Sequence, residues 1–178
     1  MKKAIIGAGG FGREVYNSLS FGEKVNTVFF VDDIYWDGSN EIILPISKFD
    51  PLEYKVVVAI GDPKSRKKIV EKLPKETKFF THIHPSSIIL GDDVEIGEGS
   101  IICAGTIITT NIKLGKHTHL NLQTTIGHDC IIGDYFTTAP GVKISGNCNI
   151  SDLVYIGTNS SVKEKINITN NVTIGLNS

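Results

Sequence analysis

Residues 90–130 read LGDDVEIGEGSIICAGTIITTNIKLGKHTHLNLQTTIGHDC, and an aliphatic side chain returns at every sixth position of this stretch. The same step, continued from Leu90 to Ile174 without an insertion, meets Ile, Leu or Val at fourteen of fifteen positions. Thr138 is the exception. We call these fifteen positions the anchors. The residue after an anchor is usually glycine or serine, and a second small or apolar residue usually lies two positions before it.

A period of six residues indicates a particular fold. An α-helix needs an apolar spacing near 3.6 residues, and a half-buried strand needs a spacing of 2. Six residues suit one short strand and one turn, so three units complete a triangular coil with the anchors inside, and coils stack at about 4.8 Å. Because each coil buries its anchors only against its neighbours, stability comes from stacking. We therefore predict an all-β parallel β-helix of about five coils over residues 83–178.

Residues 1–82 follow a different pattern, in which strand-like and helix-like segments alternate. Short apolar runs predict strands at residues 3–6, 27–31, 55–60 and 78–80. Helical spacing predicts helices at residues 12–20 and 63–73, and residues 32–40 are expected to form a loop. This order predicts an α/β subdomain, Rossmann-like, with a small parallel sheet and covering helices.

A glycine-rich turn joins the first predicted strand to the first predicted helix. Gly7, Gly9 and Gly12 have the spacing G-x-G-x-x-G, and Asp32 lies about twenty residues further on. In this context the glycines let the backbone approach a pyrophosphate at a helix N-terminus. A tight strand-to-helix turn that needs glycine is the alternative interpretation. A complete dinucleotide site with its substrate-handling groups would need more chain than these eighty residues, so a dehydrogenase is not favoured.

Composition excludes several classes of function. The formal net charge is −1 and the sequence pI is about 6.5. The chain therefore lacks the excess of positive charge that is typical of proteins that bind nucleic acid or an anionic membrane. Cys103, Cys130 and Cys148 are too few and too scattered for a disulfide framework, and we expect buried structural thiols. No apolar run approaches the roughly 18 residues of a membrane span, so we expect a cytoplasmic protein.

The chain resembles a known family. The repeat of Ile, Leu or Val followed by Gly resembles the hexapeptide motif of left-handed parallel β-helix acyltransferases. One subfamily uses the following motifs in this order: Gly7-Ala8-Gly9-Gly10-Phe11-Gly12-Arg13-Glu14-Val15, Val31-Asp32-Asp33, Val58-Ala59-Ile60-Gly61, His84-Pro85 and Ile126-Gly127-His128-Asp129-Cys130. These members resemble the N-acetyltransferases of nucleotide-linked amino sugars in bacterial surface glycan synthesis and the sialic-acid O-acetyltransferase-like proteins. The resemblance implies a left-handed coil, whereas the general rule for parallel crossovers gives a right-handed one.

For residues 1–82, the resemblance implies a subdomain that binds the nucleotide of a sugar nucleotide. Its implied substrate-binding residues near the diphosphate are Gly7, Gly9, Gly10 and Phe11. Asp32, Asp33 and Gly61 are then expected near the base and the ribose. By pattern alone, the two aspartates also suit a solvated turn after a strand.

For residues 83–178, the resemblance implies the catalytic groups of an acetyltransferase that uses acetyl-CoA and no metal. The base is His128, with Asp129 as its acidic partner and Asn121 beside it. One coil of eighteen residues beyond His128 lies Gly146, whose backbone N–H is expected to donate to the thioester oxyanion. Without the resemblance, a His-Asp dipeptide is more often surface polarity, and Gly146 also suits a turn.

The family further implies a homotrimer with coenzyme A in the groove between neighbouring subunits. Many relatives place a second histidine just before the segment Pro140-Gly141, where this chain has Thr137. The chain stops in register at Ile174-Gly175-Leu176-Asn177-Ser178, where relatives continue. We expect a shortened, uncapped β-helix with weakened coenzyme binding.

Three other functions are compatible with the same scaffold. O-acetyl transfer to a sugar hydroxyl uses the same machinery, and the residues leave open the acceptor, its ring position and its nucleotide. A metal hydratase of the γ-carbonic-anhydrase type would use His117, His119 and His128 as zinc ligands. An inactive nucleotide-sugar-binding module is the third alternative.

Overall fold

The computed structural model describes residues 1–178, which divide into two units. Residues 1–61 and 65–80 form the first unit, and residues 62–64 and 81–178 form the second. No helix in the chain combines the length and the apolar character that a membrane crossing requires.

The first unit is built on one parallel sheet of five strands in the order β3-β2-β1-β4-β5. The strands are β1 (Lys2–Ile6), β2 (Thr27–Val31), β3 (Ile43–Pro45), β4 (Tyr54–Val58) and β5 (Lys78–Phe79). The helices are α1 (Gly10–Ser18), α2 (Phe21–Lys24) and α3 (Pro63–Lys72), with short 3-10 helices at Asp33–Tyr35 and Ile46–Lys48. Apolar residues of α3 pack against the sheet core.

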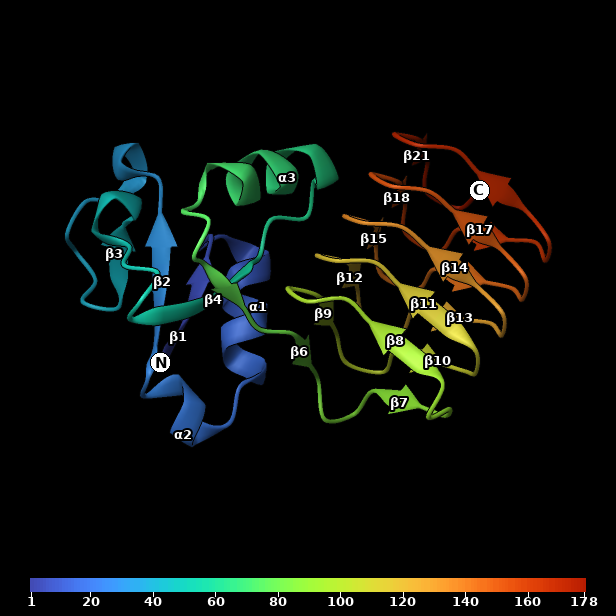
Figure 1. Cartoon of the computed structure of the whole chain (residues 1–178), viewed down its shortest axis with the longest axis horizontal. Coiled ribbons are helices and arrows are strands. Elements are labelled where there is room, and N and C mark those ends of the chain that lie inside the picture. The colour runs from blue at the N-terminus through green and yellow to red at the C-terminus, as the bar shows by residue number, and fades with distance from the viewer. The chain divides into compact units, whose positions relative to one another are not determined.

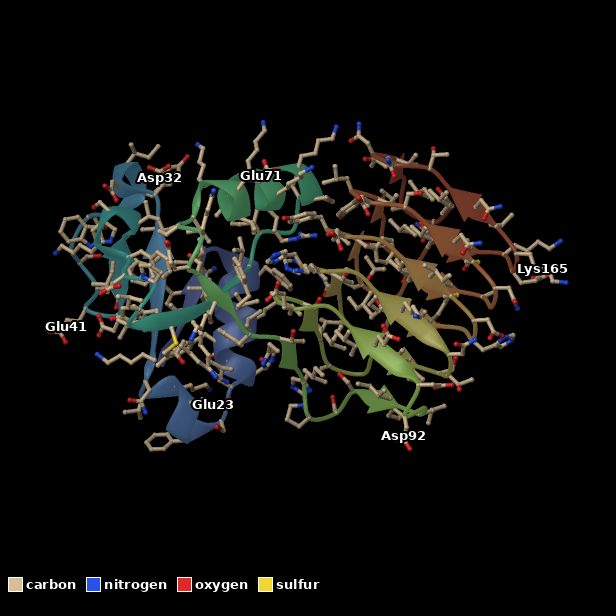
Figure 2. The ribbon with its side chains drawn as sticks, in the orientation of Figure 1. Glu23, Asp32, Glu41, Glu71, Asp92 and Lys165 are labelled. Atoms are coloured by element: carbon tan, nitrogen blue, oxygen red, sulfur yellow. The ribbon has the colours of Figure 1, made fainter.

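The order of the strands determines where a ligand can bind. The chain passes from β1 outward to β2 and β3, and then returns to the other side of β1 to form β4. Open parallel sheets bind ligands beyond the carboxyl ends of the strands at such a reversal. Here the carboxyl end of β1 leads into Gly7 and that of β2 leads into Asp32, as Figure 2 shows for the labelled aspartate.

Most of the predicted elements of the first unit form, and one strand was missed. Strand β3 lies beyond the predicted loop at residues 32–40, and three residues that end in proline are too few to show an alternating pattern. Within the predicted loop, Asp32 caps a 3-10 turn by accepting a hydrogen bond from the Ile34 N–H at 3.2 Å. Helix α1 begins at Gly10, two residues earlier than predicted.

The second unit is a left-handed parallel β-helix, as predicted. Sixteen short strands form three parallel sheets of five, five and six strands, and consecutive strands belong to different sheets in turn (Figure 1). The strands are β6 (His82–Ile83), β7 (Ile88–Ile89), β8 (Val94–Ile96), β9 (Ile101–Ile102), β10 (Ile107–Ile108), β11 (Ile112–Leu114), β12 (His119–Leu120), β13 (Thr125–Ile126), β14 (Ile131–Ile132), β15 (Thr137–Thr138), β16 (Lys143–Ile144), β17 (Asn149–Ile150), β18 (Tyr155–Ile156), β19 (Ser161–Val162), β20 (Asn167–Ile168) and β21 (Thr173–Ile174).

The anchors form the core of the β-helix. Except at the first strands β6 and β7, ladder partners from one coil to the next are eighteen residues apart. Ile108, Ile126 and Ile144 therefore stack in one column and are buried. Thr138 is also fully buried. Its hydroxyl accepts a hydrogen bond from the Asn121 N–H at 3.0 Å and pairs with the Thr124 hydroxyl at 2.8 Å, so the one polar anchor is satisfied.

The anchor predicted at Leu90 is wrong. In the first coil, Ile88 pairs with Ile107 and Ile89 pairs with Ile108, so Ile89 occupies the register of an anchor. The Leu90 side chain is 66% exposed. One extra residue therefore lies between β7 and β8. Because residues 88–90 are all aliphatic, the sequence pattern fits either frame.

The two residues of β14 provide a direct test of which side chains point into the core of the β-helix. Ile132 is 2% exposed and Ile131 is 57% exposed. We expect Ile132→Ala to lower the free energy of unfolding by about 2–5 kcal/mol, because it leaves a cavity between stacked coils. Ile131→Ala is the matched control, and we expect it to change stability by about 0.5 kcal/mol or less. Urea unfolding followed by circular dichroism measures both, and equal losses would contradict the assigned register.

Candidate active site

His128 lies at a corner of the β-helix, between β13 and β14. It follows Gly127, where an added Cβ would lie 2.6 Å from the Gly146 nitrogen of the next coil. Glycine is therefore required at Gly127 for the two coils to pass this closely. The His128 side chain is 57% exposed, so a substrate can reach its ring.

The Asp129 carboxylate holds one nitrogen of this ring. Asp129 Oδ2 lies 2.6 Å from His128 Nδ1, and Asp129 Oδ1 accepts a hydrogen bond from Asn111 Nδ2 at 2.6 Å. The bond from Asn111 first, and the contact with His128 second, lower the pKa of Asp129 below its usual range. An ionised carboxylate can only accept, so His128 Nδ1 is the donor and Nε2 presents a lone pair.

Gly146 lies directly against the His128 ring, one coil further on. An added Cβ at Gly146 would lie 2.7 Å from His128 Cε1 and 2.8 Å from Nε2. The absence of a side chain at Gly146 therefore makes the space in which the imidazole lies.

The backbone N–H of Gly146 donates to no group of the protein. At the equivalent position of the neighbouring corner, the N–H of Lys116 donates to Asp134 Oδ1 at 2.7 Å, and the N–H of Asp134 donates to Asp152 Oδ1 at 2.8 Å. The Gly146 residue is buried in the chain, and its N–H is a donor beside His128 that no protein group uses. The structure brings together three of the four predicted catalytic residues.

The fourth, Asn121, does not lie beside His128 within one chain. It follows β12 on the preceding corner, and its side-chain oxygen accepts a hydrogen bond from the Leu122 N–H at 2.7 Å. Seven residues separate the two positions, and six residues already move the chain from one side of the coil to the next. Thr137, at the place of the relatives' second histidine, is buried in β15 and is also away from this corner.

The thiols near this corner are part of the core. Cys130 donates to the Ser145 carbonyl at 3.3 Å, and burial raises the pKa of its thiol to about 11. Cys148, one coil further on, donates to the Lys163 carbonyl at 3.2 Å and is fully buried. Cys103 is also buried. Buried thiols are poor nucleophiles, which agrees with the predicted structural role.

The three histidines of the hydratase alternative do not meet. His117 is buried and stacks on Tyr135 with ring centroids 5.1 Å apart, and His119 is buried in β12. His128 lies on a different corner. The structure contains no group of three His, Cys, Asp or Glu side chains that could hold a metal ion.

In the first unit, two glycines of the predicted fingerprint are required by the local backbone. Gly7 has φ +105°, a conformation that side chains rarely adopt, and its N–H donates to the Phe30 carbonyl at 2.8 Å. A Cβ at Gly12 would collide with the Gly7 carbonyl oxygen. These two residues build the tight turn between β1 and α1.

At Gly9 and Gly10, neither the local backbone nor a close protein contact requires glycine. Gly9 is the N-cap of α1 with φ −68°, which any residue can adopt, and a Cβ at either position would meet no atom within 4 Å. The first N–H groups of a helix of this length bind anions well. A backbone that is bare at both positions suits the close approach of a phosphate, and Phe11 follows in the first turn of α1.

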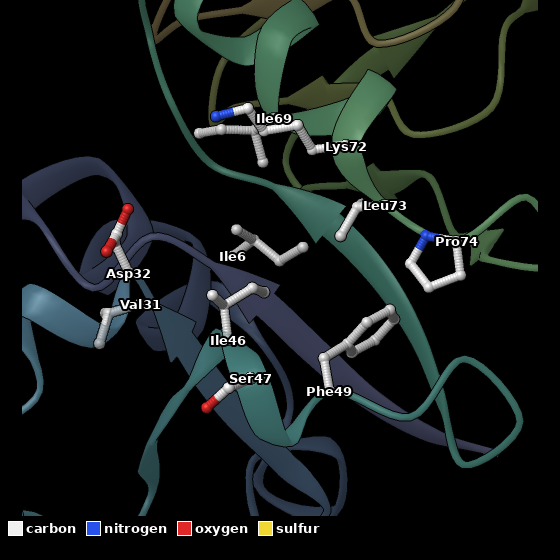
Figure 3. Close-up of a pocket in the computed structure, with 10 residues that line it drawn as sticks. All are labelled: Ile6, Val31, Asp32, Ile46, Ser47, Phe49, Ile69, Lys72, Leu73 and Pro74. Atoms are coloured by element: carbon white, nitrogen blue, oxygen red, sulfur yellow. The ribbon is translucent and has the colours of Figure 1, made fainter.

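Two adjoining cavities open beyond the carboxyl ends of β1 and β2. One has a volume of about 540 Å³, and its lining includes Gly7, Gly9 and Asp32. The other has about 390 Å³ and adds apolar side chains such as Phe49 and Leu73 (Figure 3). Ile6, Val31, Asp32 and Ile69 line both. An apolar floor beside a carboxylate and a helix N-terminus suits a nucleotide.

Some of the residues predicted to bind the nucleotide do not line these two cavities, and some lining residues were not predicted. Asp33 lies outside both cavities, and its carboxylate accepts from the Ser47 N–H at 3.1 Å. Gly61 also lies outside them, and its carbonyl accepts from Arg66 at 3.1 Å. Gly10 and Phe11 are likewise not in the lining. Tyr35, Asp37 and Ser39 line the larger cavity and were missed, because they lie in a segment predicted only as a loop.

Known proteins resemble the chain at both the sequence and the fold level. Residues 2–73 match the family described as the PglD N-terminal domain. The chain is 34% identical to a GDP-perosamine N-acetyltransferase of Escherichia coli O157:H7 over 173 residues, which cover 91% of this chain and 78% of the relative.

Two solved structures have the same fold at a sequence identity above one quarter. WeeI from Acinetobacter baumannii AYE is 33% identical, with a TM-score of 0.87 over 99% of this chain and 90% of that one. The acetyltransferase domain of PglB from Neisseria gonorrhoeae FA1090, in complex with acetyl coenzyme A, is 27% identical. Its TM-score is 0.86 over 98% of this chain and 88% of that one.

Proposed function

The chain belongs to the family of hexapeptide-repeat N-acetyltransferases that includes GDP-perosamine N-acetyltransferase, and we propose that it transfers an acetyl group from acetyl-CoA to the amino group of a nucleotide-linked amino sugar. The product would be an acetamido sugar for bacterial surface glycans. The observation that carries the proposal is the corner where His128, Asp129 and Gly146 meet.

His128 acts in this proposal as the general base. The amine attacks the thioester carbonyl carbon while Nε2 of His128 takes its proton, and Asp129 stabilises the imidazolium that forms. The carbon–sulfur bond then breaks, and the proton passes from the imidazolium to the leaving thiolate of coenzyme A. The sum is one acetyl group moved from sulfur to nitrogen, with the thiol released.

Gly146 would stabilise the charge that develops on the thioester oxygen. Its N–H has no partner in the protein and lies beside the ring that accepts the proton. A preorganised backbone donor of this kind costs no rearrangement during the reaction. Asn121 lies on another corner of its own chain. It would therefore contact the substrate at this site only if a second subunit contributed it.

The two parts of the chain would have different roles in the reaction. Residues 1–82 would bind the nucleotide, with Gly7, Gly9, Gly10 and Phe11 near the diphosphate and Asp32 near the base or ribose. Asp33 and Gly61 would support the loops that surround this cavity. Residues 83–178 would form the acyltransferase domain.

The proposed assembly is a homotrimer in the cytoplasm, with coenzyme A in the groove between neighbouring β-helices. A site formed between subunits would hold the nucleotide sugar and acetyl-CoA in one geometry. Light scattering of the purified protein measures the oligomeric state directly.

A substrate panel tests the activity. The purified protein is incubated with acetyl-CoA and GDP-, UDP- or dTDP-linked amino sugars, and release of free thiol is followed. We expect one carrier to react, and hydroxylamine to leave the product intact, because amides resist it and O-acetyl esters do not. A hydroxylamine-labile product would instead show transfer to a hydroxyl. No thiol release with any amino sugar would refute the proposal.

The bare backbone at Gly9 gives a variant for the nucleotide subsite. We expect Gly9→Leu to leave the melting temperature unchanged, because a Cβ at this position would meet no protein atom within 4 Å and the backbone there suits any residue. The same side chain would lie where the diphosphate approaches, so KM for the nucleotide sugar should rise by about 10-fold or more. Gly22→Leu, at another open position in α2, is the control and should change neither value. Steady-state kinetics and thermal unfolding provide the measurements.

A further inference from the structure

We propose that Asn111 is a positioning residue for this acetyl transfer, because its side-chain amide holds the Asp129 carboxylate in place against His128. The inference rests on the proposed function and adds a residue of the preceding coil to the same site. Asn111 contacts neither reacting group and would act through Asp129 alone.

The contacts restrict the carboxylate at both of its oxygens. Asn111 lies eighteen residues before Asp129, on the same corner and one coil earlier. Its Nδ2 donates to Asp129 Oδ1 at 2.6 Å, while Oδ2 faces His128 Nδ1 at 2.6 Å. With one partner for each oxygen, the carboxylate can neither rotate about its axis nor turn toward water without losing a hydrogen bond.

Asp129 needs such a restraint because its surroundings provide little else. Its side chain is 42% exposed, and its backbone has φ +60° at the corner of the coil. The hydrogen bonds of Asp129 Oδ1 and Oδ2 are those with Asn111 and His128 alone. An exposed contact between a carboxylate and a side-chain donor is normally weak and mobile. The neutral amide of Asn111 fixes the carboxylate and leaves the negative charge that His128 requires.

The preceding coil in turn fixes Asn111. The Thr110 hydroxyl donates to both carboxylate oxygens of Asp93, at 3.0 and 2.9 Å. The backbone N–H of Asn111 and the Thr110 hydroxyl together lower the pKa of Asp93. The corner turn that presents Asn111 is therefore itself tied down. Asp93, Asn111 and Asp129 form one column over three coils, and the column ends at the base.

The column has a chemical consequence for the ring. While the carboxylate faces Nδ1, the proton of neutral His128 stays on Nδ1, and Nε2 keeps the lone pair that accepts the proton of the amine. A carboxylate that turns away lets the proton reside on Nε2 for part of the time, which blocks the base. Loss of Asn111 should therefore reduce kcat and leave both KM values unchanged.

Asn111→Gly removes the amide without straining the turn. Asn111 has φ +51°, which glycine adopts readily. We expect kcat to fall by about 10-fold with the melting temperature and both KM values retained. Asn171→Gly is the matched control, because Asn171 has φ +62° on another corner and its side chain has no hydrogen bond. A kcat of Asn111→Gly within about twofold of the wild type would overturn the proposal.

A reciprocal exchange separates positioning from a merely structural role. In Asp129→Asn, the single side-chain oxygen faces two donors, so one of them meets the new NH2 group. The double variant Asn111→Asp with Asp129→Asn restores the order, because residue 129 then donates to residue 111 and accepts from His128. We expect its kcat to exceed that of Asp129→Asn by about 10-fold. Losses that simply multiply would contradict the inference.

A spectroscopic measurement keeps this inference separate from the proposed activity. In ¹H–¹⁵N spectra of the wild type without substrate, we expect a downfield signal for the proton on His128 Nδ1. In Asn111→Gly this signal should disappear through faster exchange with water, and in Asn171→Gly it should remain. If no amino sugar is acetylated, the function fails while the spectra still decide the role of Asn111. A signal unchanged in Asn111→Gly would refute that role.

Discussion

Replacing Gly146 by alanine is expected to lower kcat by about 10³-fold while the β-helix stays folded. A Cβ at this position would lie 2.7 Å from His128 Cε1 and 2.8 Å from Nε2, which is too close for the ring to keep its place. The ring can move away because the His128 side chain is 57% exposed. The β-helix therefore stays folded, while the general base is displaced. A displacement of about 1 Å in a catalytic group can cost 10²-fold by itself.

The control for this variant is the neighbouring residue. Ser145→Ala removes an exposed hydroxyl and adds no atom near the ring, so its kcat should stay within about twofold of the wild type. Thermal unfolding should give the same transition for both variants and for the wild type. A fully active Gly146→Ala protein would show that His128 is not constrained by this contact, and an unfolded one would show that the glycine is structural.

The repeat period made the β-helix and this corner predictable from the sequence. Because one coil is eighteen residues, addition to 128 led directly to Gly146, and the structure places the two residues in contact. Subtraction from 129 would have led to Asn111 in the same way, since the column continues in both directions. His128 and Asp129 are neighbours in the sequence, but the family resemblance, and not the repeat period, predicted them as base and acidic partner.

At positions that the repeat period does not determine, the sequence predictions were incomplete or wrong. Three aliphatic residues in a row allowed two frames at residues 88–90, and only the pairing of Ile89 with Ile108 separates them. Asn121 was expected beside His128, but the period itself places these residues on different corners. In the first unit, Tyr35, Asp37 and Ser39 reach the larger cavity from a loop, and the path of a loop depends on tertiary contacts that no local pattern contains.

The second large effect is expected from His128→Asn. The asparagine amide can still donate to Asp129, so the variant keeps the hydrogen bond while it removes the group that accepts a proton at the position of Nε2. Loss of a positioned general base typically costs 10²–10⁴-fold, and we expect kcat to fall by about 10³-fold. Calorimetry should show that the nucleotide sugar still binds, because its proposed site lies in residues 1–82.

A second histidine provides the comparison. His84 is half-buried and has its Nδ1 2.8 Å from the Ser86 hydroxyl, but it has no carboxylate partner. His84→Asn should therefore retain kcat. If His128→Asn kept wild-type turnover, the amine would have to lose its proton elsewhere, since no other histidine lies at this corner. If it lost nucleotide binding together with turnover, His128 would belong to the binding of substrate, and the division of labour between the two parts of the chain would be wrong.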